Sequence, residues 1–368
     1  MKVRTRDFIY TTDDLFFAST NYIHPHDRFI SFLRYIPDDN GDREKNGKNY
    51  SKVTSEEAYD YLRGNHPEYL YFCDITQTEM MGVPLNKVRE IIKPENRLEE
   101  IKKRHERGKN EDNNKLDPLI GKLLDLSDFF HYKAGIAYEN LGISGSILPN
   151  LQKEDISDID FVVYGLNNHR KAMETFKKFK DKEVEIPQVS KKITLSKIQD
   201  SYWERIYKKR MKDLSLSKEE FCWYEDRKNN RGLIEGTLFD ILATRNWDEI
   251  QGTWGNMRYE PIGIAKVEAT VEDAIASFDN PATYKVKDLN VLEIVKGNRT
   301  EITKINKIVS YTHTYAGQAI EEEKIIAKGK IEKVLADING ETEVSYRLVV
   351  GTTRESIDEF IKLKNILL

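Results

Sequence analysis

The sequence is poor in cysteine and lacks long apolar runs. Only two of its 368 residues are cysteines, Cys73 and Cys222, and neither has another Cys or His nearby at a spacing typical of metal ligands. A disulfide framework, a zinc ribbon and an iron–sulfur motif are therefore excluded. No apolar run approaches the roughly 20 residues that a membrane-spanning helix needs, and the first eight residues include several charges. We expect a cytoplasmic protein that does not bind membranes.

An excess of charge of one sign is also missing. Lys and Arg number 58 against 62 Asp and Glu, which gives a net charge of −4. A polyanionic partner would therefore have to be held by a local basic surface, because the overall field does not attract it. Aromatic residues make up 10% of the chain, which excludes intrinsic disorder for most of it. The length predicts two or three packed units.

Hydrophobic patterning predicts an α+β multidomain protein. Residues 1–93 alternate short apolar runs with Asp, Asn and Gly clusters, which is typical of a β-rich N-terminal domain. Residues 94–116 have the mixed charge of a helix that continues into a polar linker. Helical and strand patterns alternate over residues 117–258, which predicts a central α/β domain with a small mixed sheet flanked by helices and a basic helical insertion.

The last third of the chain, residues 261–368, has a period of two in about five stretches. A five-stranded OB-like β-barrel is the expected solution, because it leaves few bare strand edges. A short helix from residue 355 to the end is expected to cap it. Tyr311, His313 and Tyr315 alternate on one expected strand and are candidates for stacking on bases, although the same alternation fits side chains that point into the barrel.

A Gly-Ser pair and two alternating acids occur in the segment 139–165. A strand is expected to end at Gly145-Ser146 and a short helix to follow, so that backbone amides and the Ser146 hydroxyl can hold phosphate oxygens. Asp158 and Asp160 stand at positions i and i+2 of an expected strand, which places both carboxylates on one face about 6.5 Å apart. Two such acids repel each other unless cations lie between them, and the spacing suits two magnesium ions.

A third acid, Asp240, stands alone in an apolar run between Phe239 and Ile241. A charge buried in such a run needs a partner or a metal. In a strand next to the first pair, Asp240 would supply a third carboxylate to the metal site. The alternative is a salt bridge to Arg231 or Arg245. Glu235 is a weaker candidate for the same role.

Gly145-Ser146, Asp158-Ile-Asp160 and the distant Asp240 together resemble the signature of the DNA polymerase beta-like nucleotidyltransferase superfamily, and in particular its archaeal predicted nucleotidyltransferases. The resemblance covers about residues 139–165 and 231–245. It implies that Gly145 and Ser146 bind an NTP such as ATP, and that Asp158, Asp160 and Asp240 hold Mg²⁺ or Mn²⁺. It further implies transfer of a nucleoside monophosphate to a hydroxyl with release of pyrophosphate.

The insertion between residues 191 and 231 suggests the acceptor. It has twelve basic and seven acidic residues, interleaved with Tyr202, Trp203, Tyr207, Trp223 and Tyr224. Cations beside aromatic rings are typical of proteins that bind single-stranded nucleic acid, but an amphipathic helix that buries its aromatic residues has the same composition. RNA or another nucleic acid is therefore the expected acceptor. The alternatives are a catalytically inactive nucleic-acid-binding protein, and a transferase acting on a small molecule or a protein hydroxyl.

Overall fold

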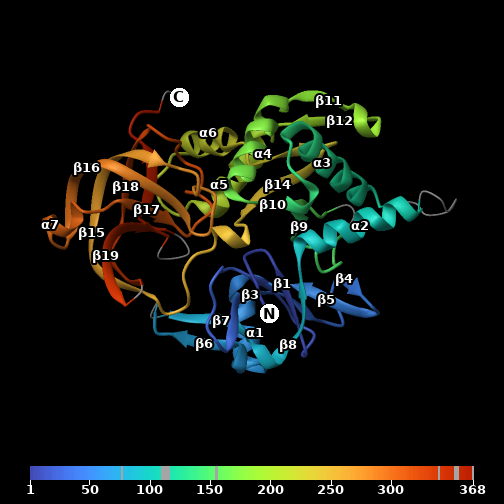
Figure 1. Cartoon of the computed structure of the whole chain (residues 1–368), viewed down its shortest axis with the longest axis horizontal. Coiled ribbons are helices and arrows are strands. Elements are labelled where there is room, and N and C mark those ends of the chain that lie inside the picture. The colour runs from blue at the N-terminus through green and yellow to red at the C-terminus, as the bar shows by residue number, and fades with distance from the viewer. Residues whose placement is uncertain (76–77, 109–116, 154–155, 339, 352–355, 367–368) are drawn as a thin grey trace. The chain divides into compact units, whose positions relative to one another are not determined.

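The computed structural model describes residues 1–75, 78–108, 117–153, 156–338, 340–351 and 356–366. The chain forms two compact units (Figure 1). The first unit comprises residues 1–197 and 230–254, and the second comprises residues 198–229 and 255–368. Across the described ranges, no helix is both long enough and apolar enough to cross a membrane. The expected α+β multidomain class is confirmed at this coarse level.

The first unit begins with an N-terminal sheet, as its apolar runs predict. Its central path runs in the order β4-β5-β3-β2-β1-β8, and β7 pairs with β3 and β6. The strands are β1 (Phe8–Thr11), β2 (Phe16–Ser19), β3 (Arg28–Pro37), β4 (Arg43–Lys45), β5 (Lys48–Lys52), β6 (Leu70–Cys73), β7 (Thr78–Pro84) and β8 (Val88–Ile92). A helix that the patterning did not indicate, α1 (Ser55–Asn65), begins at a Thr54–Glu57 capping box.

Both faces of this N-terminal sheet are buried. One face packs on α1, in a cluster that includes Ile9, Phe17, Leu33, Ala58 and Leu62. The other face packs on the loop that follows Gly145-Ser146, in a cluster of Phe8, Phe16, Tyr35, Tyr50, Leu148 and Leu151. Residues of an antiparallel strand alternate between faces, so one strand can serve both clusters. The second cluster fixes the N-terminal sheet against the loop that carries the Gly-Ser pair.

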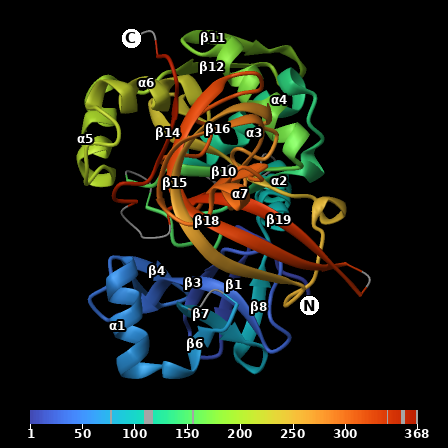
Figure 2. The same cartoon turned by 90° about the vertical axis from the view of Figure 1, so that its left-hand side faces the viewer.

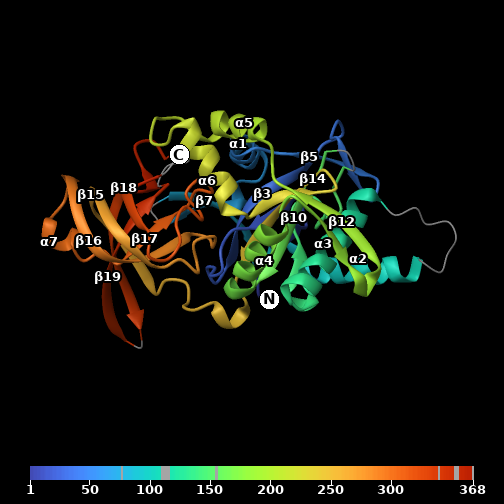
Figure 3. The same cartoon turned by 90° about the horizontal axis from the view of Figure 1, so that it is seen from above.

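The central sheet of the first unit has six strands in the order β11-β12-β13-β14-β10-β9. They are β9 (Leu141–Ile143), β10 (Ile159–Tyr164), β11 (Lys182–Ile186), β12 (Lys191–Ser196), β13 (Arg231–Ile234) and β14 (Thr237–Thr244). The helices of this part are α2 (Pro94–Gly108), α3 (Pro118–Ala134) and α4 (Leu166–Phe179). β10 and β14 are parallel, and α3 and α4 lie on the opposite side of them from β3 (Figures 1 and 3).

Five strands of the second unit are hydrogen-bonded in a closed ring. The order is β15-β16-β17-β19-β18 and back to β15, with β17 and β19 parallel (Figure 2). The strands are β15 (Met257–Asp273), β16 (Ala282–Lys296), β17 (Lys307–Ser310), β18 (Lys324–Ile338), β19 (Glu341–Val350) and β20 (Phe360–Leu363). The helices are α5 (Asp200–Arg210), α6 (Lys218–Lys228) and α7 (Arg299–Ile302).

The expected C-terminal helix is wrong over the described residues. Phe360–Leu363 instead form β20, which pairs antiparallel with β18. Ile361 and Leu363 are buried while their neighbours are half-buried, which is the alternation of a strand. β18 offers unpaired backbone groups at this point, and a strand satisfies them where a helix would not. Residues 355, 367 and 368 of the expected helix lie outside the described residues.

The basic insertion also differs from the expectation that it belongs to the catalytic domain. Both of its helices, α5 and α6, are part of the second unit. Phe221 and Tyr224 of α6 are buried in one cluster with Ala265 and Val267 of β15. Trp203 is buried as well, and Tyr207 and Trp223 are partly buried against the same cluster. Phe221, Tyr224, Tyr207 and Trp223 thus belong to a hydrophobic core, which favours the amphipathic-helix interpretation for these residues.

The proposed aromatic row of Tyr311, His313 and Tyr315 is wrong. β17 ends at Ser310, and the chain then turns, so the three residues do not share a strand face. Tyr311 is 51% exposed, whereas Tyr315 is 1% exposed and its carbonyl accepts a hydrogen bond from the Tyr284 hydroxyl at 2.8 Å. The period of two in the sequence continued beyond the end of the hydrogen-bonded strand.

Phe221 of α6 is buried in the core of the second unit. Phe221→Ala should lower the free energy of unfolding by about 3–5 kcal/mol, because it removes a ring that is 1% exposed. Leu214→Ala, in the same segment but 94% exposed, should change it by less than about 0.5 kcal/mol. Urea unfolding of both variants measures this. Equal effects would show that α6 is not packed in a core.

Candidate functional site

Two of the three acids lie side by side on the central sheet. β10 and β14 are parallel neighbours in which Asp160 and Asp240 are register partners. Register partners on parallel strands point to the same face, and the strands are about 4.8 Å apart. Ile159, Phe161 and Ile241 point to the opposite face, where they join the core beneath α3 and α4. Asp158 immediately precedes β10 and is two residues from Asp160.

The Gly-Ser loop is packed against Asp160. The Ser144 amide donates to the Asp160 carbonyl at 2.9 Å. Gly145 has φ +60°, and a Cβ at that position would lie 1.9 Å from Asp160 Oδ2. Only glycine leaves room for this carboxylate. The structure therefore brings together the two motifs that the sequence places about fifteen residues apart.

The short helix expected after Gly145-Ser146 is not formed. Residues 145–150 make turns, in which the Leu151 amide donates to the Ser146 carbonyl at 2.9 Å. The Ser146 side chain is buried, and its hydroxyl donates to Ser157 Oγ at 3.1 Å. Pro149 and the packing of Leu148 and Leu151 on the N-terminal sheet favour this turn over a helix. The loop therefore has no helix N-terminus to offer a phosphate.

Asp240 is bound by Arg231. Arg231 is the register partner of Asp240 on the antiparallel strand β13. Its Nη2 donates to Asp240 Oδ2 at 2.6 Å, and its Nε donates to Oδ1. The salt bridge that the sequence left as an alternative is therefore present. Glu235, the weaker candidate, lies in the β13–β14 turn, where its Oε1 accepts from the Thr194 amide at 2.6 Å, and it is not part of the site.

Asp158 and Asp160 have no hydrogen-bond or ion-pair partner for their carboxylates among the described residues. Burial, together with the negative charges of Asp158 and Asp240, raises the pKa of Asp160 to about 7. Arg6 and Arg34 act in the opposite direction. Two neighbouring carboxylates without a cation are the donor set that Mg²⁺ or Mn²⁺ takes, so these residues fit such an ion.

Sequence reasoning missed a set of cations from the N-terminal sheet. Arg6, Arg34 and Lys52 all act electrostatically on the acids of β10. Burial raises the pKa of Tyr35 to about 12, Arg43 and Arg34 lower it, and Asp160 and Asp158 raise it. Tyr35 is therefore close enough to the cations and to the acids to be influenced by both. No motif marks these residues, because they come from strands more than 100 positions away.

Polar contacts hold the N-terminal sheet in this place. The Ser144 hydroxyl donates to the Arg6 carbonyl at 3.0 Å, directly beside Gly145. Lys45 Nζ donates to the Pro149 carbonyl at 2.8 Å, and Arg43 donates to the Leu151 carbonyl. The turn that follows the Gly-Ser pair thus contacts β4 through its carbonyls and the hydrophobic cluster through its side chains. The acids and the cations are parts of one compact unit.

Another group of possible metal ligands, Asp13, His66 and Glu68, lies elsewhere on the N-terminal sheet. Lys87 Nζ is 3.0 Å from Asp13 Oδ2 and 3.1 Å from Glu68 Oε1. The ammonium already supplies the counter-charge that a metal would bring, and a metal would have to displace it. The carboxylates of Asp158 and Asp160 fit a cation better, because no side-chain cation contacts them among the described residues.

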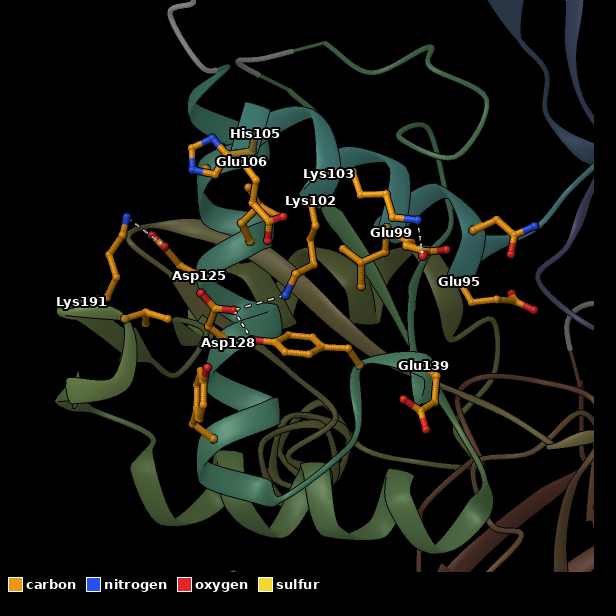
Figure 4. A pocket seen from close by; sticks show the side chains of 17 residues that line it. Glu95, Glu99, Lys102, Lys103, His105, Glu106, Asp125, Asp128, Glu139 and Lys191 are labelled. Carbon is orange, nitrogen blue, oxygen red and sulfur yellow. Dashed lines mark hydrogen bonds and ion pairs between the residues drawn. The ribbon is translucent and has the colours of Figure 1, made fainter. Parts of the chain in front are cut away.

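A cavity of about 750 Å³ lies between α2 and α3, and none of the three acids lines it (Figure 4). Its charged groups are largely paired with one another. Lys102 is 3.6 Å from Asp128 Oδ1, Lys103 pairs with Glu99, and Lys191 is 3.1 Å from Asp125 Oδ1. Because these pairs satisfy one another, we place the chemistry at the carboxylates of β10 and β14 and not in this cavity.

Comparison with known proteins finds one full-length relative of interest. The chain is 41% identical over 375 residues to "Uncharacterized protein MJ1086" of Methanocaldococcus jannaschii, and the match covers 99% of this chain and 100% of that protein. No family model matches the chain. No solved structure matches it either.

The contact between Gly145 and Asp160 can be tested by substitution. Gly145→Ala should weaken Mg²⁺ binding, because the new methyl group must displace the Asp160 carboxylate. Gly135→Ala is the matched control: Gly135 has φ +66° and nothing within 4 Å of a built Cβ, so it reports only the backbone strain of about 1–2 kcal/mol. Thermal shift against Mg²⁺ concentration measures binding. An unchanged midpoint for Gly145→Ala contradicts the contact.

The raised pKa of Asp160 predicts a pH-dependent stability of the metal-free protein. A carboxyl whose folded pKa is raised favours the fold below its unfolded value, near 3.8, and loses that contribution as the pH rises through about 7. Asp160→Asn should therefore raise the Tm in EDTA, with little gain near pH 4 and the full gain above pH 7. A gain of 1 kcal/mol corresponds to about 2–4 °C for a large domain. A pH-independent difference contradicts the assignment.

Proposed function

We propose that the family to which this chain and the M. jannaschii protein MJ1086 both belong consists of magnesium-dependent nucleotidyltransferases. They transfer a nucleoside monophosphate from an NTP to a hydroxyl and release pyrophosphate. The observation that carries the proposal is the pairing of Asp160 with Asp240 on adjacent parallel strands, with Gly145 packed against the Asp160 carboxylate. Acids, glycine loop and strand order together support the resemblance to polymerase beta-like enzymes.

The residues divide the work as follows. Asp158 and Asp160 hold Mg²⁺ or Mn²⁺ through carboxylates that no cation contacts among the described residues. When bound, the metal lowers the pKa of the acceptor hydroxyl and stabilises charge on the phosphate oxygens. Asp240 lies beside Asp160 and contributes a third carboxylate when Arg231 releases one of its oxygens. Until then Arg231 keeps the repulsion between the acids low.

Gly145 and Ser146 are the proposed nucleotide-binding residues. Gly145 sets the distance between the loop and Asp160, so a phosphate that approaches the loop also meets the metal ligands. The Ser146 hydroxyl contacts Ser157 in the structure and would turn to a phosphate oxygen by rotation about one bond. Because the loop forms turns and not a helix N-terminus, the remaining phosphate charge has to be balanced by side chains.

The acceptor is proposed to be RNA or another nucleic acid. The closed ring of β15, β16, β17, β19 and β18, with one parallel pair, supports an OB-type barrel, a fold that often reads oligonucleotides. Trp203, Phe221 and Tyr224 of α5 and α6 are buried, which argues against base stacking by these three rings. The proposal of a nucleic-acid acceptor therefore rests on the closed ring of strands. A small-molecule or protein hydroxyl is the alternative outcome.

Turnover tests the proposed activity. The purified protein should release pyrophosphate from NTP only with Mg²⁺ or Mn²⁺ present, in a reaction supplied with total cellular RNA. Asp160→Asn should lower the rate by about 100-fold or more, since a charge-stabilising group at the reacting phosphate is lost. Glu235→Gln, an acid nearby in sequence but outside the site, is the control and should leave the rate unchanged. Equal rates for the two variants would falsify the metal assignment.

A label transferred from α-labelled NTP identifies the acceptor. Recovery of the label in RNA supports the nucleic-acid acceptor, and binding of that RNA should weaken steeply with salt because counterions are released. Recovery of the label only in protein or in a small molecule contradicts it, while leaving the nucleotidyltransferase activity intact.

A further inference from the structure

β3 contains an extra residue, Arg34, whose charge acts on Asp160. In the pairing of β2 with β3, Phe16 opposes Tyr35 and Phe17 opposes Leu33, so Arg34 has no partner on β2. This is a β-bulge, which reorients side chains and is frequent beside active sites. Leu33 packs in the cluster under α1, whereas Tyr35 packs with Leu148 and Leu151 on the opposite face. Without the extra residue, side chains two positions apart would share one face.

Lys52 and Arg6 approach the same place from two other elements. Lys52 is the register partner of Tyr35 across β3 and β5, so its side chain leaves the sheet on the face that Tyr35 uses. Arg6 precedes β1, and its backbone carbonyl accepts the Ser144 hydroxyl beside Gly145. Its backbone has φ +74°, a conformation that non-glycine residues adopt at an energetic cost. Three cations from separate elements thus lie close enough to Asp160 for their charges to interact with it.

These three cations lack counter-charges within hydrogen-bonding reach. In the ranges that the structure describes, neither Arg34 nor Arg6 nor Lys52 forms a side-chain ion pair or hydrogen bond. Neighbouring cations on the same sheet are used differently. Arg43 and Lys45 of β4 donate to backbone carbonyls of the docked turn. From the other side, Lys153 of the segment after that turn pairs with Asp42. One set of cations therefore holds the turn after the Gly-Ser pair against the N-terminal sheet. A second set, the side chains of Arg34, Lys52 and Arg6, has no such contact among the described residues.

The electrostatic environment agrees with this geometry. Arg34 and Arg6 lower the pKa of Asp160. The Lys52 side chain is exposed as a whole, but the protein around its ammonium group lowers its pKa, Arg34 lowers it further, and Asp158 and Asp160 raise it. Once a divalent cation neutralises Asp158 and Asp160, the three side-chain cations repel one another without compensation. A polyanion that is bound together with the metal removes that repulsion.

We propose that Arg34, together with Lys52 and Arg6, binds the polyphosphate of the nucleotide, so that the N-terminal sheet forms one wall of the nucleotide site. The inference rests on the proposed nucleotidyltransferase activity and assigns its triphosphate subsite. A triphosphate is favoured over the backbone of a nucleic acid because the three cations converge on one place beside the acids, whereas a strand would need cations spread along its length. Arg34 can donate two parallel hydrogen bonds to one phosphate. We therefore expect it to contribute more to the binding of the triphosphate than Lys52 or Arg6 does.

The test measures binding of inorganic triphosphate and of ATP in the presence of Mg²⁺, by calorimetry on the full-length protein. Arg34→Gln should weaken both by about 10- to 100-fold, the size expected for a charge-assisted hydrogen bond to phosphate. Arg34→Lys, which keeps the charge but loses the paired donors, should fall between Arg34→Gln and the unaltered protein. Arg28→Gln is the matched control, since Arg28 lies on the same strand and its guanidinium pairs with Asp27 at 2.9 Å. It should leave triphosphate binding unchanged.

The outcomes separate this inference from the proposed activity. Loss of triphosphate binding in Arg34→Gln supports the subsite even if no acceptor is labelled, in which case only the proposed activity fails. Normal triphosphate and ATP binding by a folded Arg34→Gln protein overturns the subsite, even if turnover of NTP is observed. Weakened binding of a single-stranded oligonucleotide with unchanged triphosphate binding also overturns it and assigns the cations to the nucleic-acid backbone. A Tm equal to that of Arg28→Gln confirms that the comparison is made between folded proteins.

Discussion

Repulsion between Asp160 and Asp240 is the constraint on which the first unit depends. The apolar residues of β10 and β14 fix the register, because a slip by one residue would turn Ile159 and Phe161 away from α3 and α4. That register forces the two acids onto one face, as neighbours on parallel strands. Their charges have to be balanced from outside β10 and β14. Arg231 does this for Asp240 from β13. Asp160 has a raised pKa, and only the more distant cations Arg6 and Arg34 act against it.

The N-terminal sheet supplies those distant cations, so it is part of the site. It can do so because both of its faces are buried, one on α1 and the other on the turn that follows Gly145. The same turn therefore has two neighbours, Asp160 on one side and the N-terminal sheet on the other. This double contact couples the position of Arg34 to that of the acids. An appended binding domain joined only by a linker would not position charges in this way.

The second unit uses its aromatic residues differently from what their composition suggests. Phe221 and Tyr224 of α6 are buried in the cluster of the C-terminal strands, and Tyr207 and Trp223 pack partly buried against it, while Lys208 and Lys209 of α5 are exposed. Stacking on bases and packing in a core both use aromatic residues interleaved with charged ones, so composition does not distinguish these two roles. The burial of the rings does. Contacts from these helices to a nucleic acid would therefore be to phosphates, with little preference for sequence.

The sequence by itself determined the β-rich and mixed α/β character of the chain and the residues of the acidic pair. The isolated Asp240 required a partner, because the cost of a buried charge is a local property. Alternation predicted one face for Asp158 and Asp160, and in the structure Asp158 immediately precedes β10 while Asp160 lies in it. The sequence did not determine that Arg231 would be that partner, that the basic insertion would pack on the C-terminal strands, or that Phe360–Leu363 would form a strand. The role of Arg34 beside the acids could not be predicted from the sequence for the same reason. Its direction depends on a bulge and its neighbours come from strands more than 100 residues away, and only the tertiary structure decides which distant surfaces meet.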